Sequence, residues 1–159
     1  MAHSYIATVD WQRGTQSFAE NKYSRAHTWS FDGGVTVAGS SAPNVLPPPM
    51  SREDAVDPEE ALVASASACH MLFFLALAAR KGFTIDRYTD KAVGEMTKNE
   101  RGKLFVSKIT LNPAVTWSGA SRPSLADIDA LHHRAHEECY IANSIRAEIV
   151  ISSPASPIA

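Results

Sequence analysis

The sequence predicts an α+β fold in which antiparallel strands accompany one long buried helix. Three observations favour this class: a capped apolar segment of helix length at 57–82, strand pairs around turn sequences at 24–39 and 84–117, and an alternating final strand at 146–152. No internal repeat or linker divides the chain, so we expect one domain over residues 1–159.

The strands before the helix are short and separated by loops. Residues 3–11 mix β-branched and aromatic residues with polar ones, which is typical of a strand. Residues 24–39 form a hairpin around Gly33-Gly34, a common turn sequence. Residues 40–56 contain three consecutive prolines, which cannot enter a strand ladder and favour an extended loop.

The helix has clear signals at both ends. Asp57 suits the N-cap, Pro58 the first helical position and Glu60 the acidic position of a capping box. Gly82 marks the C-terminal end after Lys81. The interior is apolar or small almost all round, so the helix must be buried on most sides.

Further elements follow the helix. Strands are expected at 84–98 and 103–117, joined by a turn at 99–102. Ser124 opens a second helix that ends at about Glu138 and places apolar residues at helical spacing.

Composition excludes several classes of partner. The 159 residues carry a net charge of −2 with no basic stripe, which argues against nucleic-acid binding. The start of the chain lacks the pattern of a secretory signal, so a cytoplasmic protein is expected. The longest apolar stretch, 69–79, is too short to span a bilayer, so no membrane partner is expected.

Two cysteines are the first candidates for chemistry. In a reducing cytosol, cysteines are more often free or redox-active than joined in a structural disulfide. Taken alone, Cys69 and Cys139 are more often small core side chains. His132, His136 and Cys139 share a helix face, which leaves a zinc site open beside the simpler interpretation of a solvated polar face.

The charged candidates also have simple explanations. Capping and the helix dipole account for Glu59 and Glu60. Arg25 suits a surface cation or a cation–π partner of Trp29, and Arg52 a solvated charge in the proline-rich loop.

Three stretches together resemble one known family. They are YSRAHTWSFDGG at 23–34, DPEEALVASASACH at 57–70, and CYIANSI at 139–145 followed directly by RAEIVI. Together they resemble the OsmC/Ohr family of peroxide-reducing proteins, and the resemblance covers nearly the whole chain.

The resemblance implies antiparallel sheets wrapped around a long central helix, and a two-cysteine peroxidase that needs no metal, haem or other cofactor. Cys69 matches the family's peroxidatic cysteine, Cys139 its resolving cysteine and Glu59 its catalytic acid. Arg25 is our choice for the catalytic arginine, with Arg52 as the alternative. The implied partners are a hydroperoxide substrate and a lipoyl-type dithiol that resets the enzyme.

One residue departs from the family pattern. Tyr140 follows the second cysteine, where many members have proline, and this leaves the local geometry of Cys139 open.

The chemistry needs more than a buried thiol. Peroxide attack requires the thiolate, but burial in an apolar helix raises a thiol pKa, so a cation such as Arg25 must lie nearby. Glu59 is suited to orient the guanidinium. Apolar residues after Cys69, at 71–74, suit either an organic hydroperoxide pocket or simple core packing.

Spacing along the helix predicts a dimer. Glu59 and Cys69 are ten residues apart, about 15 Å along a straight helix, so their side chains cannot meet at one peroxide. Either the helix is broken or kinked, or Glu59 serves the Cys69 of a second subunit. We favour the second, an intertwined homodimer with shared active sites. The other functions to be weighed are a non-catalytic dimer that binds a small ligand and a zinc-stabilised module.

Overall fold

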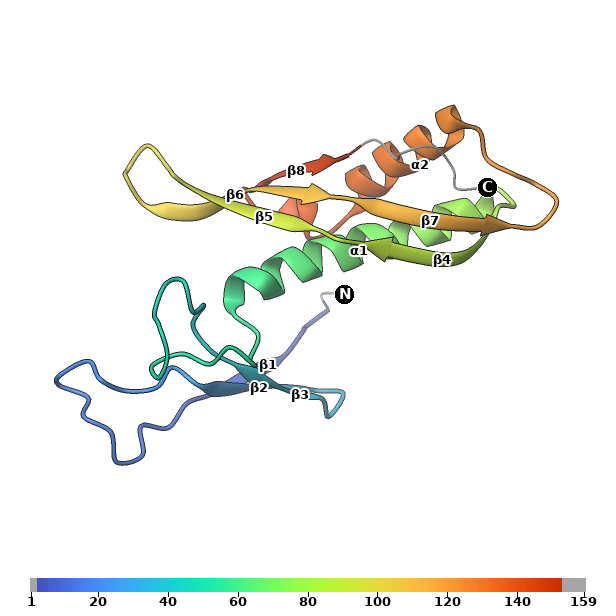
Figure 1. Ribbon diagram of the computed structural model, residues 1–159. Coiled ribbons are helices and arrows are strands. Elements are labelled where there is room, and N and C mark those ends of the chain that lie inside the picture. The colour runs from blue at the N-terminus through green and yellow to red at the C-terminus, as the bar shows by residue number, and fades with distance from the viewer. Residues whose placement is uncertain (1–2, 153–159) are drawn as a thin grey trace. The chain divides into compact units, whose positions relative to one another are not determined.

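The computed structural model describes residues 3–152 and shows the predicted α+β class (Figure 1). Contacts within the chain divide it into two compact units, residues 1–61 and 62–159, which are described separately below. The expectation of one domain over the whole chain stays a prediction.

The first unit is built on a small antiparallel sheet. Its strands are β1 (Ala7–Asp10), β2 (His27–Phe31) and β3 (Thr36–Gly39), in that order. The predicted hairpin is confirmed: the N–H of Gly34, at φ 81°, donates to the carbonyl of Phe31 at 3.0 Å. The predicted first strand is shorter than expected.

Helix α1 (Pro58–Arg80) is unbroken and has the predicted caps. The Asp57 side chain accepts from the Glu60 N–H at 2.7 Å, and the Glu60 carboxylate accepts from the Asp57 N–H at 3.2 Å. At the other end Gly82 adopts φ 77°, and the Phe83 N–H donates to the carbonyl of Ala78 at 3.1 Å. The sequence therefore determines both ends of this helix through local hydrogen bonds.

By length and composition alone, α1 could span a membrane, with a mean hydropathy of 2.0 over its best window. The prediction that no segment is long enough is wrong, because the apolar run extends back through the alanine-rich first half of the helix. Core helices pass the same test, and α1 contributes to the core of the second unit through Ala66, His70, Phe74 and Ala78.

Up to residue 152, the second unit contains five strands. They are β4 (Thr84–Asp90), β5 (Val93–Lys98), β6 (Leu104–Leu111), β7 (Pro113–Ser118) and β8 (Glu148–Ile151). The predicted second hairpin is confirmed in its pairing, with β4 against β7 and β5 against β6.

Each predicted long strand of this hairpin is divided in two. At the division the Asp90 carboxylate accepts from the Asn112 N–H at 2.6 Å, and the Asn112 amide donates to the Lys91 carbonyl at 2.9 Å. Pro113 follows and has no N–H to give to a ladder. In addition, β8 pairs with β6 in parallel, a direction that alternation within a strand cannot predict.

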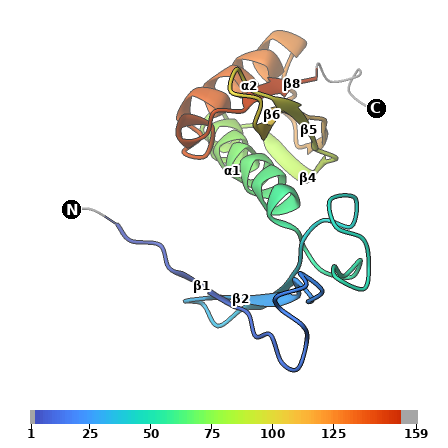
Figure 2. The same cartoon turned by 90° about the vertical axis from the view of Figure 1, so that its left-hand side faces the viewer.

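The five strands form two sheets, β4-β7 and β5-β6-β8, and two helices pack with them. Helix α2 (Leu125–Glu138) starts at the predicted Ser124, whose side chain forms a capping box with Asp127. A 3-10 turn, η1 (Ala142–Ser144), leads into β8. In Figure 2, α1 and α2 lie side by side, and buried residues of both helices share one apolar core: Phe74, Ala78, Leu131 and Ala135.

Candidate functional site

The two cysteines meet in the second unit. Cys69 lies in the middle of α1 and is half-buried, whereas Cys139 is the C-cap of α2 and is fully buried. The Cys69 side chain lies close enough to that of Cys139 to raise its pKa, and both are free thiols. The two cysteines are seventy positions apart in the sequence, so the sequence could not show that they lie close together.

Backbone groups after α2 hold Cys139. Its carbonyl accepts from the Asn143 N–H at 3.0 Å and from the Asn143 amide at 2.9 Å, while its sulfur accepts from the Ala142 N–H at 3.3 Å. Tyr140, at the position where proline was expected, points its exposed ring edge-on to Phe73 at 5.1 Å. The turn that places Cys139 therefore needs no proline at this position. The sequence analysis did not single out Asn143.

The environment of Cys139 keeps its thiol protonated. Burial and the hydrogen bond with Cys69 raise the pKa of Cys139 to about 11, although the Ala142 N–H acts in the opposite direction. At neutral pH, Cys139 is therefore a thiol that can donate to Cys69. Because Cys69 is also the more exposed of the two, it is the better placed to meet an incoming peroxide.

The predicted acid, Glu59, lies in the first turn of α1. The capping box uses Glu60, which leaves the half-buried Glu59 outside it. Because α1 is continuous from Pro58 to Arg80, the ten residues between Glu59 and Cys69 correspond to about 15 Å of helix rise. A broken helix, one of the two explanations considered above, is thus excluded.

The two candidate arginines differ in their partners within the first unit. Arg52 is exposed and forms a bidentate pair with Asp54, at 2.9 and 2.7 Å. The Arg25 guanidinium lies 3.7 Å from the centre of the Tyr23 ring and donates to the Asn21 side chain at 2.6 Å. Its aromatic partner is Tyr23 and not the expected Trp29.

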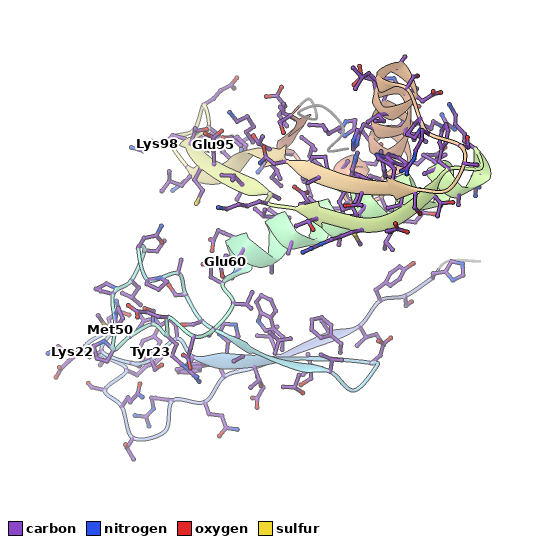
Figure 3. The ribbon with its side chains drawn as sticks, turned by 45° about the vertical axis from the view of Figure 1, so that its right-hand side comes forward. Lys22, Tyr23, Met50, Glu60, Glu95 and Lys98 are labelled. Carbon is purple, nitrogen blue, oxygen red and sulfur yellow. The ribbon has the colours of Figure 1, made fainter. Side chains whose placement is uncertain are left out.

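The backbone at Arg25 is also fixed. Its N–H donates to the Met50 carbonyl at 2.8 Å, which ties the segment before β2 to the proline-rich loop; Figure 3 labels Met50 and Tyr23. Within residues 3–152 Arg25 forms no ion pair, so its charge is not neutralised by a carboxylate.

The histidines do not form the considered zinc group. No three metal-ligating side chains come together among residues 3–152. Instead, the Nε2 atom of His70 lies 3.0 Å from the Nδ1 atom of His132, with both rings buried and stacked. The interpretation as a solvated face fits His133, which is exposed beside Glu137, but not His132.

The histidine pair was missed in the sequence, although a signal was present. His132 falls in the apolar stripe of α2 with Ile128, Leu131 and Ala135, and His70 interrupts an apolar helix. Burial lowers the pKa of each imidazole to about 4, helped for His70 by the neighbouring His132 and His136 and opposed for His132 by Asp129 and Asp90.

Of the two interpretations of residues 71–74, core packing fits Phe74, and the organic hydroperoxide pocket stays a prediction. Phe74 is fully buried in the core, while Leu72 is 63% exposed. A pocket of about 450 Å³ opens near the end of α1, but neither cysteine lines it; its residues are Leu75, Ala79, Gly82, Phe83, Thr84 and Ile85.

Comparisons with known proteins find relatives of this chain. Residues 51–153 match the family model described as OsmC-like protein. An OsmC-like protein of unknown function from Vibrio cholerae is 48% identical, with a TM-score of 0.93 over 95% of this chain and 99% of that one. The search of curated proteins gives no match.

More distant structures share the fold. An organic hydroperoxide resistance protein from Elizabethkingia anophelis is 16% identical, with a TM-score of 0.68 over 95% of this chain and 94% of that one. The organic hydroperoxide resistance protein OhrB of Bacillus subtilis is 18% identical, with a TM-score of 0.65 over 94% of this chain and 96% of that one.

Proposed function

Since the chain belongs to the OsmC-like protein family, we propose that it is a thiol peroxidase that reduces organic hydroperoxides through a disulfide between Cys69 and Cys139. The observation that carries the proposal is the contact of the two thiols within one chain. The names of the distant neighbours from Elizabethkingia anophelis and Bacillus subtilis support hydroperoxides as the substrate class.

The reaction proceeds in two steps. The Cys69 thiolate attacks the peroxide, an S–O bond forms as the O–O bond breaks, and the alcohol leaves with a proton, so that Cys69 becomes a sulfenic acid. Cys139 then attacks that sulfur, and the hydroxyl leaves as water with the thiol proton. A dithiol of lipoyl type reduces the disulfide by exchange, and the reaction takes place in the cytoplasm.

Arg25 is the better candidate for the cation that favours the Cys69 thiolate. Its guanidinium is held by an aromatic ring and by an amide, both uncharged, whereas Asp54 already neutralises Arg52. A cation without a carboxylate partner stabilises a nearby thiolate and polarises a peroxide more strongly, because no opposite charge offsets its own. Glu59 orients this guanidinium in the assembled site.

The assembled site is that of a homodimer. Along α1 a line of apolar residues stays exposed in the single chain, at Ala64, Ala68, Leu72 and Ala76. These positions follow one another at intervals of four and form one continuous face, which water solvates poorly. A second copy of the chain covers this face and brings Glu59 of the partner subunit to Cys69.

Thiol titration tests the enzyme. One equivalent of cumene hydroperoxide is expected to remove two thiols per chain, and a dithiol such as dihydrolipoamide is expected to restore both. The measurement is the thiol content before oxidation, after oxidation and after reduction. Unchanged thiols would instead favour a non-catalytic dimer that binds a small ligand.

Leu72→Glu tests the dimer. A charge in the middle of the exposed apolar face is expected to turn the dimer into a monomer. Peroxide turnover is then lost, because Glu59 of one chain no longer lies near Cys69 of the other. Sedimentation velocity and a peroxidase assay report the two effects.

Leu125→Glu is the matched control, since Leu125 is 58% exposed but lies on α2. It is expected to leave both the sedimentation coefficient and the turnover unchanged. A Leu72→Glu protein that sediments and turns over like the unmodified chain would overturn the shared site.

A further inference from the structure

Helices α1 and α2 are joined by one hydrogen bond between their side chains, counted over residues 3–152. It runs between His70 Nε2 and His132 Nδ1 at 3.0 Å, and the two residues are 1% and 4% exposed. Phe74 stacks on His132 with ring centres 4.3 Å apart, which fixes the plane of that ring. The contact is therefore directional and fully enclosed.

Two buried imidazoles stabilise a core less than apolar side chains would. His70 Nδ1 and His132 Nε2 are buried and have no hydrogen-bond partner among residues 3–152, and the same holds for Nδ1 of His136, one turn after His132. A buried polar atom without a partner lowers stability, so apolar side chains of similar volume would stabilise these positions more. What a hydrogen bond adds is a defined distance and direction, which apolar packing leaves looser.

The imidazole pair and the two thiols lie on the same two helices. His70 directly follows Cys69 on α1, and His132 precedes Cys139 by seven residues, about two turns of α2. The two helices thus touch at two polar points, the imidazole pair and the thiol pair. Disulfide formation tolerates little error, because the Cα atoms must approach to within about 4.4–6.8 Å with a defined dihedral angle.

We propose that the His70–His132 hydrogen bond is a positioning contact that holds α1 and α2 in the register at which Cys69 and Cys139 form their disulfide. The inference rests on the proposed function for its role in turnover. In the step concerned, the S–S bond forms, the S–O bond of the sulfenic acid breaks, and the Cys139 proton leaves with the hydroxyl as water. Neither imidazole gains or loses a proton or a bond in this step.

A role as the base for Cys139 is excluded by magnitude. The pKa of each imidazole is about 4, while that of Cys139 is about 11. Moving the thiol proton to either ring is therefore unfavourable by roughly seven powers of ten. The contribution of the pair is geometric.

The test compares His132→Leu with His132→Asn. Asparagine places a polar atom where Nδ1 stands, whereas leucine removes the hydrogen bond and keeps an apolar filling. After one equivalent of cumene hydroperoxide, trapping with dimedone measures the sulfenic acid and non-reducing mass spectrometry measures the disulfide. We expect sulfenic acid to form at the unmodified rate in both variants.

The second step is expected to differ. In His132→Leu the disulfide forms roughly 10- to 100-fold more slowly, as a misplacement of about 1 Å would cause, and His132→Asn recovers most of this loss. Ile128→Ala, which removes a buried apolar side chain one turn earlier on α2 and leaves both imidazoles in the sequence, controls for lost stability. Normal disulfide formation in His132→Leu, or equal slowing in Ile128→Ala, would overturn the proposal.

A second measurement needs no peroxide. Each variant is equilibrated with mixtures of reduced and oxidised dithiothreitol, and the fraction of Cys69–Cys139 disulfide is measured. His132→Leu is expected to reduce the disulfide equilibrium constant at least tenfold, with recovery in His132→Asn. If hydroperoxide leaves the thiols of the unmodified protein intact, the proposed function fails, but this equilibrium still decides the role of the pair.

Discussion

Cys69→Ser is expected to abolish hydroperoxide turnover, with a loss of at least about a thousandfold, because the removal of an essential nucleophile costs that much or more. A serine hydroxyl in the middle of α1 has neither the acidity nor the polarisable sulfur that attack on an O–O bond requires. The measurement is consumption of cumene hydroperoxide in the presence of a dithiol.

Cys139→Ser should behave differently, and the difference identifies the order of the two steps. Its Cys69 is expected to react with the first equivalent at nearly the unmodified rate and then to remain as a sulfenic acid. One thiol per chain is lost in place of two. Excess hydroperoxide then carries Cys69 on to the sulfinic acid, since no second thiol intercepts it.

The structure gives a reason for this order. Cys139 is fully buried with a pKa of about 11, whereas Cys69 is half-buried and accessible. If Cys139→Ser lost its first oxidation and Cys69→Ser retained it, the two roles would be reversed. If both variants kept full turnover, the two-cysteine mechanism would be wrong.

Elements with local signals were predictable from the sequence. The ends of α1 and α2 follow from capping residues within one turn, and the first hairpin follows from Gly33-Gly34. The division of the long hairpin at Asp90 and Asn112 was not predictable, because it depends on a side chain that reaches across to the partner strand. The same holds for the parallel pairing of β8 with β6.

The candidate site shows the same limit. Motif resemblance named Cys69 and Cys139, but only the packing of α1 on α2 shows that they touch. Two interpretations of the sequence were wrong because they depend on packing between distant segments. Arg25 lies over Tyr23 and not Trp29, and His132 is buried and not on a solvated face. The spacing along the helix, in contrast, was enough to predict that Glu59 and Cys69 of one chain lie far apart, because a continuous helix has a fixed rise per residue.

Acidification is expected to destabilise the protein between pH 6.5 and pH 4 through the buried imidazoles. Each of His70 and His132 has its pKa lowered from 6.5 to about 4 in the folded chain. Above pH 6.5 both folded and unfolded chains hold these rings neutral, so they add no pH dependence. Below pH 6.5 the two imidazoles bind protons in the unfolded chain but stay neutral in the folded chain. The free energy of unfolding therefore falls with pH until the folded rings are protonated near pH 4.

The expected loss is roughly 2–4 kcal/mol for the pair, less than the sum of two separate groups, because the hydrogen-bonded rings titrate as one coupled unit. Chemical denaturation at fixed protein concentration, repeated from pH 7.5 to pH 4, measures it. Charged groups near the pair act in both directions: His136 disfavours a proton on His70, while Asp90 and Asp129 favour one on His132.

The double variant His70→Gln, His132→Asn removes both titrating rings and keeps polar atoms at the two contacting positions. In this variant the free energy of unfolding is expected to lose most of its dependence on pH between pH 6.5 and pH 4. Two surface carboxylates, Asp127 hydrogen-bonded to Ser124 and Glu137 paired with Arg134, have pKa values below their usual range. Their stabilising effect is lost as the pH falls through their ordinary values of 3.8 and 4.5 and below, so it overlaps only the lower end of the histidine window. A slope that persisted unchanged in the double variant would show that other groups cause the acid sensitivity. A slope that disappears would show that these two imidazoles cause the acid sensitivity.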